Sequence, residues 1–256
     1  MLVDSHCHLN FPEFTENILA VRQLMHQSEV GHALCVSVTL DKFPEVLALA
    51  EQYDNFYASV GVHPDYEDIE EPSIETLVAL ADHPKIVAIG ETGLDYFRLT
   101  GDLEWQRMRF RTHIRAAINV GKPLIIHTRS AAEDTLRIMK EEGAYQVGGV
   151  MHCFTETLDV ALAAIDMGFY ISFSGIVTFK NALQLKEVAQ AIPLEKMLVE
   201  TDSPYLAPAP FRGKTNQPAY VKYVAQEIAN LRGISLNEVM QATTKNFFTL
   251  FKHAKV

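Results

Sequence analysis

Short runs of hydrophobic residues alternate along this chain with longer segments in which hydrophobic residues recur every three or four positions. The short runs are typical of buried strands, and the longer segments are typical of helices with one apolar face. Regular alternation of the two predicts repeated strand–helix units and a parallel sheet. The eight strands that we expect lie at residues 2–7, 33–38, 56–60, 86–89, 124–126, 149–151, 169–173 and 197–199.

Helical patterns fill the gaps between these strands, at residues 17–28, 43–52, 74–82, 103–120, 131–142 and 182–191. Two segments near the C-terminus, 219–232 and 236–251, are expected to pack helically around or below the sheet. Eight such units in 256 residues predict an α/β fold of the TIM-barrel type, (β/α)8, in one domain that spans residues 1–256. A doubly wound open sheet is the alternative, but no Gly-x-Gly-x-x-Gly turn follows the first strand.

Residues that can bind a metal ion follow six different strands of this pattern. They are His6 and His8, His63, Glu91, His127, His152 and Asp202. A single histidine at a strand end is often structural, but the recurrence favours a shared site. The carboxyl ends of barrel strands converge on one face, so we expect these side chains to meet in one pocket.

Four of the histidines and the two carboxylates are enough to hold two divalent ions, and Zn, Mn, Mg and Co all remain open as their identity. We expect His6, His8 and Asp202 at one ion and His127 with His152 at the other. Glu91 would lie between the two ions. Such a pair activates a water molecule as hydroxide, and Asp202 is suited to orient that water or to accept its proton. Glu91 and Asp202 are therefore the expected catalytic residues.

The charge and composition narrow the class of protein. A net charge of -10 argues against a protein that coats nucleic acid electrostatically. It does not exclude a nuclease, because bound cations supply positive charge at the site itself. No apolar stretch approaches the roughly 20 residues of a membrane span, and the N-terminus lacks a signal-peptide pattern. We therefore expect a cytoplasmic protein with no membrane association and no obligatory protein partner.

Three cysteines, Cys7, Cys35 and Cys153, lie in or beside predicted strands. An odd number without Cys-x-x-Cys spacing predicts reduced, buried thiols. Cys7 and Cys153 are each adjacent to a predicted ligand histidine, and strand alternation predicts that both face away from the metals. We expect the five histidines outside the strand ends, which include His113, to be structural or exposed to solvent.

Read together, the motifs resemble those of the TatD-type metal-dependent hydrolases, a deoxyribonuclease branch of the amidohydrolase superfamily. The resemblance covers essentially the whole chain, and the motifs follow the order of that family. They are Asp4-Ser5-His6-Cys7-His8-Leu9, Gly61-Val62-His63-Pro64, Gly90-Glu91-Thr92-Gly93-Leu94-Asp95, His127-Thr128-Arg129, His152-Cys153-Phe154, Glu200-Thr201-Asp202-Ser203-Pro204-Tyr205-Leu206 and Arg212-Gly213-Lys214-Thr215-Asn216-Gln217-Pro218.

The resemblance implies a distorted barrel, a binuclear metal site with this ligand set, and hydrolysis of phosphodiesters in DNA, often from the 3′ end. Within the larger superfamily the bridging ligand is frequently a carboxylated lysine on the fourth strand. The only lysine there is Lys85, at the wrong end of the strand, which leaves Glu91 as the bridge.

Substrate-binding residues can be proposed from the same loops. His63, Arg129 and Arg212 are the candidates for holding phosphate, since a guanidinium matches two phosphate oxygens. An ion pair with Glu133 is the alternative for Arg129. Two other functions stay open: an amide or ester hydrolase that acts on a small molecule or an aminoacyl-tRNA, and a metal-binding protein without activity.

Overall fold

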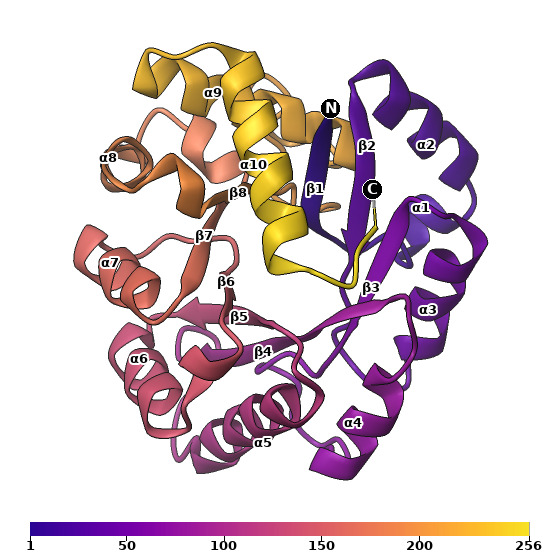
Figure 1. Cartoon of the computed structure of the whole chain (residues 1–256), viewed down its shortest axis with the longest axis vertical. Helices are drawn as coiled ribbons and strands as arrows, with labels where there is room; N and C mark the ends of the chain where they lie inside the picture. Colours follow the sequence, from indigo (N-terminus) through magenta and orange to yellow (C-terminus); the bar gives the residue numbers. More distant parts are fainter. Residues whose placement is uncertain (256) are drawn as a thin grey trace.

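Eight parallel strands form the centre of this computed structural model, which describes residues 1–255; the last residue of the expected domain, Val256, lies outside the described part. The strands pair in chain order from β1 to β8, and the helices surround them as a ring (Figure 1). Their bounds are β1 Leu2–Cys7, β2 Val30–Cys35, β3 Phe56–Val60, β4 Ile86–Asp95, β5 Leu124–Arg129, β6 Gly149–Met151, β7 Phe169–Phe173 and β8 Met197–Val199. The predicted (β/α)8 TIM-type barrel is confirmed.

The α-helices that surround the barrel are α1 Pro12–Thr15, α2 Ile18–Gln27, α3 Phe43–Gln52, α4 Ile74–Ala81, α5 Glu104–Val120, α6 Ala132–Glu141, α7 Leu158–Asp166, α8 Leu183–Ala191 and α9 Val221–Arg232, and α10 Leu236–Leu250 completes the set. Short 3-10 turns lie at Ala144–Gln146, Gly175–Thr178, Leu194–Lys196 and Pro218–Tyr220. Among residues 1–255, no helix combines the length and the apolar character that crossing a membrane requires.

The barrel closes where the first and last strands meet. Cys7 forms an isolated parallel bridge with Ser203, just beyond β8. The amide of His8 donates to the carbonyl of Ser203 at 2.9 Å, and the amide of Asp202 donates to the carbonyl of His6 at 2.9 Å. We call this junction of β1 with the segment after β8 the closing seam. It brings Asp202 to His6 and His8, although almost 200 residues separate Asp202 from the two histidines in the sequence.

One end of the barrel is filled by apolar side chains. Every strand contributes at least one buried residue to this cluster, from Val3 on β1 to Leu198 on β8. Phe247 and Leu250 of α10 pack into the same cluster, and α10 lies across that end of the barrel (Figure 1). Chemistry is thereby confined to the opposite end, where the strands finish.

The predicted strands agree closely with the observed ones, and the differences have local causes. Five strands have the predicted bounds, whereas β2 begins at Val30, three residues early. β4 and β5 extend beyond the predicted ends because Thr92 to Asp95 continue to pair with Ile126 to Arg129. Helix α7 was not predicted, although Thr157 caps its first turn by accepting a hydrogen bond from the amide of Val160.

Two glycines allow β4 and β5 to approach closely beside Glu91. Gly90 and Gly93 have φ values of 145° and 138°, which side chains rarely adopt. A Cβ atom on Gly93 would lie 2.0 Å from the carbonyl oxygen of His127. The backbone around Glu91 therefore requires glycine on both sides.

Candidate metal centre

Glu91 is the centre of the cluster that the strand ends form. Its carboxylate is buried, and its two oxygens face different partners. Oε2 lies 3.2 Å from Nε2 of His6. Oε1 lies 2.8 Å from Nε2 of His152, 3.2 Å from Nδ1 of His127 and 3.3 Å from Nε2 of His63. One oxygen of the carboxylate thus faces the imidazole of His6, and the other oxygen faces the three remaining imidazoles.

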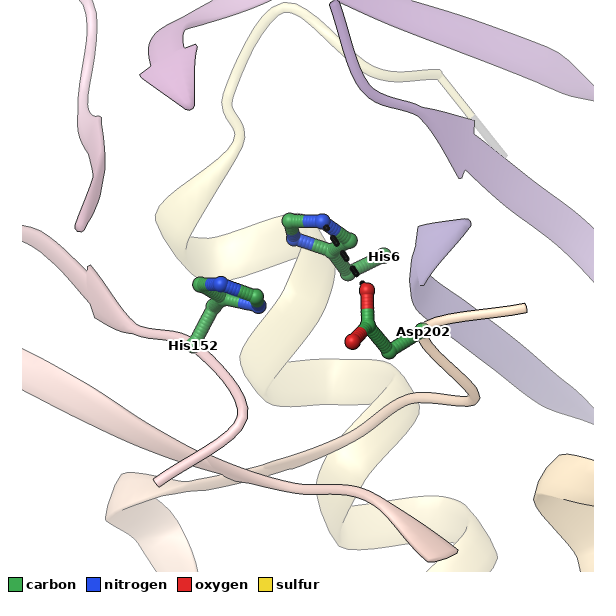
Figure 2. Close-up of side chains that lie close together, drawn as sticks. All are labelled: His6, His152 and Asp202. Carbon is green, nitrogen blue, oxygen red and sulfur yellow. Dashed lines mark ion pairs between the residues drawn. The ribbon is translucent and has the colours of Figure 1, made fainter. Parts of the chain in front are cut away.

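Asp202 completes the side of the cluster that lies on the closing seam. Its Oδ1 atom is 3.4 Å from Nε2 of His8 and 3.7 Å from Nε2 of His6. Figure 2 shows the carboxylate directed toward the ring of His6, with the ring of His152 to the left of both. The rings of His6 and His152 stack at 3.9 Å. Asp202 adopts φ 56°, a strained conformation that is common at functional sites.

In four of these histidines one ring nitrogen faces the cluster and the other, outer nitrogen faces away from it. Contacts of the outer nitrogens fix the orientation of the rings. Nδ1 of His8 lies 3.2 Å from the carbonyl oxygen of Val36, which can only accept, so this nitrogen carries the proton. The inner nitrogen of His8 then offers a lone pair to the site. The outer nitrogens of three other histidines face carboxylates in the same way: His152 with Glu200, His127 with Asp95, and His63 with Asp65. Histidines that ligate metals in proteins are almost always held in this manner.

The protonation states suit a bound cation. Burial would raise the pKa of Glu91, but the neighbouring charges of His152 and His63 outweigh burial and hold that pKa well below its ordinary value. Burial, assisted by the charge of His152, lowers the pKa of His6, which keeps this imidazole neutral. Burial opposes a positive charge on His152, yet Glu91 and Glu200 raise its pKa well above the usual range. The cluster therefore demands positive charge at its centre, and a cation meets that demand.

The distances also fit metal ligation. Atoms that bind one ion at about 2.1 Å lie roughly 3.0 to 3.4 Å apart in octahedral or tetrahedral geometry. The contacts around Glu91 and Asp202 lie close to this range. Nε2 of His152 is buried and, although it lies 2.8 Å from Oε1 of Glu91, the geometry there is not that of a hydrogen bond. Three groups converge closely enough to hold an ion: His6 with His8 and Glu91, His63 with Glu91 and His127, and His6 with His152 and Asp202.

These groups divide the residues differently from the sequence prediction. Asp202 converges with His6, as expected, but also with His152, which we assigned to the other ion. His63, predicted to bind phosphate, lies beside Glu91 and His127 and is available as a further ligand. The assignment of each residue to an ion stays a prediction.

A cavity of about 540 Å³ opens above the cluster. It is lined by all of the candidate ligands except His6, by Arg98 and Arg129, and by the aromatic rings of Phe11, Tyr66 and Tyr205. The guanidinium of Arg129 lies 3.9 Å from the ring centre of Phe97, and within the described chain no ion pair joins it to Glu133. Arg212 is exposed beside the ring of Phe179 at 4.0 Å and is not part of the cavity wall.

The prediction for Cys153 was wrong. We expected this side chain to face away from the site, but it lines the cavity, with Sγ 3.2 Å from Oγ of Ser174. Strand β6 ends at Met151, and Cys153 has φ 42°, so strand alternation no longer applies there. Cys7, which lies within β1, does pack away from the site, with Sγ near the carbonyl of Leu34.

Several residues of the site were missed by sequence reasoning. Asp95 and Glu200 lie within motifs already singled out, so their positions held a signal that we did not use. Asp65 follows His63 by two residues and binds both that ring and Arg98, at 2.7 Å from the guanidinium. Arg98 belongs to none of the motifs, and only the folded chain places it at the cavity.

A parallel barrel whose strand ends gather five histidines and two carboxylates around one cavity defines the class of metal-dependent barrel hydrolases. The chain belongs to the TatD related DNase family, whose pattern it matches over residues 3–252.

Bacterial relatives match the chain over almost its whole length. The chain is 45% identical to the uncharacterized metal-dependent hydrolase YcfH of Escherichia coli, over 98% of this chain and 95% of that protein. It is 43% identical to the uncharacterized metal-dependent hydrolase YabD of Bacillus subtilis, over 98% and 99% of the two chains. The crystal structure of YjjV, a TatD homologue from Escherichia coli, superimposes with a TM-score of 0.91 at 33% identity and covers 98% of each chain. The protein is therefore a metal-dependent hydrolase of the TatD family.

Proposed function

We propose that this hydrolase is a deoxyribonuclease that cleaves phosphodiesters of DNA with two divalent metal ions. The observation that carries the proposal is the composition of the cavity, which places two arginines beside the metal-ligand cluster. A phosphodiester carries a negative charge that guanidinium groups match, whereas a neutral amide or ester does not. The family that the chain matches is described by the same activity.

The two oxygens of Glu91 favour two candidate ion sites, one on the side of His6 and one on the side of His127 and His152, even though His152 also converges with His6 and Asp202. His6, His8 and Asp202 would hold one ion, His127 and His152 the other, with Glu91 between them. Ions held by these residues would supply Lewis-acid activation of water and would neutralise charge on the phosphate. The outer carboxylates of Asp95 and Glu200 keep the rings of His127 and His152 oriented toward Glu91.

Asp202 is the residue best placed to handle the proton of the attacking water. Its carboxylate lines the cavity, and the neighbouring His8 and His6 outweigh burial to keep its pKa below the ordinary value. It is therefore ionised at neutral pH and can accept a hydrogen bond from water in the cavity. Glu91 also lines the cavity, but its side chain is only 3% exposed against 16% for Asp202, so it would act through ligation alone.

Binding of phosphate would fall to other side chains that line the cavity. Arg129 and Arg98 reach the cavity from β5 and from the segment after β4. His63, whose Nε2 atom lies 3.3 Å from Oε1 of Glu91, is the third candidate. Arg212 would contact only a longer strand, since it lies outside the cavity wall. The cavity volume is within the range of sites for small ligands, which favours entry of a single terminal nucleotide, from the 3′ end as expected for this family.

The proposal is tested with purified protein that has been stripped of metal and reloaded with Mg, Mn, Co or Zn separately. Each form is offered single-stranded DNA, duplex DNA, RNA and an aminoacyl ester, with labels at either end of the nucleic acids. Metal-dependent release of nucleotides from DNA is the expected result. Hydrolysis of the ester with no cleavage of DNA under any metal would refute the nuclease assignment in favour of an ester hydrolase.

A further inference from the structure

A stripe of polar side chains lies on the buried face of α5. Gln106, Arg109 and His113 are spaced three and four residues apart, so they share one side of the helix. Their exposed fractions are 0%, 3% and 0%. Burying such groups costs free energy unless each finds a partner. We call these three residues the α5 polar stripe, and their partners indicate what it does.

Each member of the stripe holds one of three successive residues of the segment between β3 and α4. Nε2 of His113 accepts a hydrogen bond from the amide of Val62 at 3.0 Å. The Arg109 guanidinium donates to the carbonyl of His63 at 3.1 Å, and Gln106 donates to the carbonyl of Pro64 at 2.9 Å. The backbone on both sides of the His63 side chain is therefore fixed by one helix face.

Arg109 also holds the far end of the same segment. Its Nε and Nη2 atoms donate to the two carboxylate oxygens of Glu71 at 2.8 and 2.5 Å, a bidentate pair. The ring of Trp105 lies 4.7 Å from the guanidinium. Because the fork of Arg109 joins His63 to Glu71, it closes the segment into a loop that presents His63 to the cavity.

Gln106 joins this loop to the strand that carries Glu91. Its Oε1 atom accepts from the amide of Asp95 at 2.9 Å, and its Nε2 atom also lies 3.3 Å from the carbonyl of Asp95. The carboxylate of Asp95 in turn accepts from His127 at 3.0 Å. The buried side-chain amide of Gln106 therefore connects the loop that carries His63 with Asp95, the residue that binds His127.

We propose that Gln106, Arg109 and His113 are positioning residues that set the place of the His63 ring relative to Glu91. The inference rests on the role proposed above for His63 at the site. A helix that only packed against the barrel would bury apolar side chains here, as it does with Phe110 and Ile114. Apart from Nδ1 of His113, which contacts the carbonyl of Arg109 in the same helix, the polar groups of the stripe instead bind the two segments that carry His63 and Asp95.

The proposal is tested by a double-mutant cycle between Arg109→Met and His63→Ala, with cleavage of a DNA oligonucleotide as the measurement. Arg109→Met should lower kcat/KM by about ten- to a hundredfold, because small displacements of a positioned group have effects of this size. In the His63→Ala background the same change should have little further effect. An equal loss in both backgrounds would mean that Arg109 acts only through general stability and would overturn the proposal.

Arg111→Met is the matched control. Arg111 lies on the same helix and pairs with Glu141 and Glu142 at 2.6 Å each, away from the cavity. We expect it to lower stability and to leave kcat/KM within about twofold of the parent. If Arg109→Met fails to fold, Glu71→Gln replaces it, since it weakens the same pair from a half-exposed position.

Hydrogen exchange supplies a readout that needs no substrate. Amides in residues 61–73 should exchange at least about tenfold faster in Arg109→Met or Glu71→Gln than in Arg111→Met, because the loop loses its anchor. Unchanged exchange in this segment would overturn the proposal even in an active enzyme. Absence of DNA cleavage in the parent protein would refute the nuclease function separately, with the exchange result still deciding whether the stripe holds the loop.

Discussion

Acidification should destabilise the folded chain through His113. The ring is fully buried on α5, where it accepts a hydrogen bond from Val62, and burial lowers its pKa from 6.5 to about 4. The folded state therefore holds His113 neutral at a pH where the unfolded chain would protonate it. Stability from this group is complete above about pH 6.5 and declines as the pH falls toward about 4.

The size of the effect follows from the difference between the two pKa values. A shift of about 2.5 units corresponds to about 3 kcal/mol at most, since one unit is about 1.4 kcal/mol. At about pH 5, roughly 2 kcal/mol of this is already lost, while at about pH 7.5 almost none is lost.

Chemical denaturation of the parent and of His113→Gln, both with metals removed, measures this contribution. Glutamine keeps a group that can accept the hydrogen bond of Val62 but does not titrate. We expect the parent to be the more stable protein at pH 7.5, with its advantage reduced by about 2 kcal/mol at pH 5. A constant difference between the two proteins across this range would refute the assignment of a neutral, buried His113.

Three more predictions concern the site and its frame. Glu91→Gln should lose metal and activity together, because a carboxamide is a poor bridge between two cations; full occupancy by two ions in elemental analysis would place the bridge elsewhere. Arg129→Ala should keep its metals and bind DNA with a salt dependence weaker by about one unit of slope, as measured by titration at several salt concentrations; an unchanged slope would remove Arg129 from the phosphate contacts. Lys122→Met should lower the free energy of unfolding by about 2 kcal/mol, since the buried ammonium donates to the carbonyls of Ala81 and Ile86; denaturation with no loss would show that water replaces it.

The part of the site that could be predicted from the sequence is the part that strand ends carry. His6, Glu91, His127, His152 and Asp202 each follow or end a hydrophobic run, and barrel topology alone brings such ends to one face. The hydrophobic period that predicts the strands therefore also predicts the cluster. The hydrophobic pattern does not predict which ligand binds which ion, because this depends on side-chain rotamers that the spacing of residues does not determine.

The supporting residues could not be predicted in the same way. Arg109 and Glu71 are 38 positions apart, and neither belongs to a recognisable motif. Polar residues on a helix ordinarily face solvent, so the stripe on α5 gave no sign that it was buried. The sequence predicts that His113 is either structural or exposed to solvent. Only its contact with the amide of Val62 shows that it is structural. Long-range hydrogen bonds of this kind leave no local pattern in the sequence.

The closing seam of the barrel links the fold to the chemistry. Asp4 lies within β1, and its carboxylate accepts from the amide and hydroxyl of Thr201 at 2.8 and 2.6 Å. This pair fixes β1 against the segment that follows β8, one residue before Asp202 and two residues before His6. The donors on the seam are therefore aligned by the same contacts that close the barrel. A cation held between His6, His8 and Asp202 would in turn join the first strand to the last, so closure of the barrel and formation of this ion site support each other.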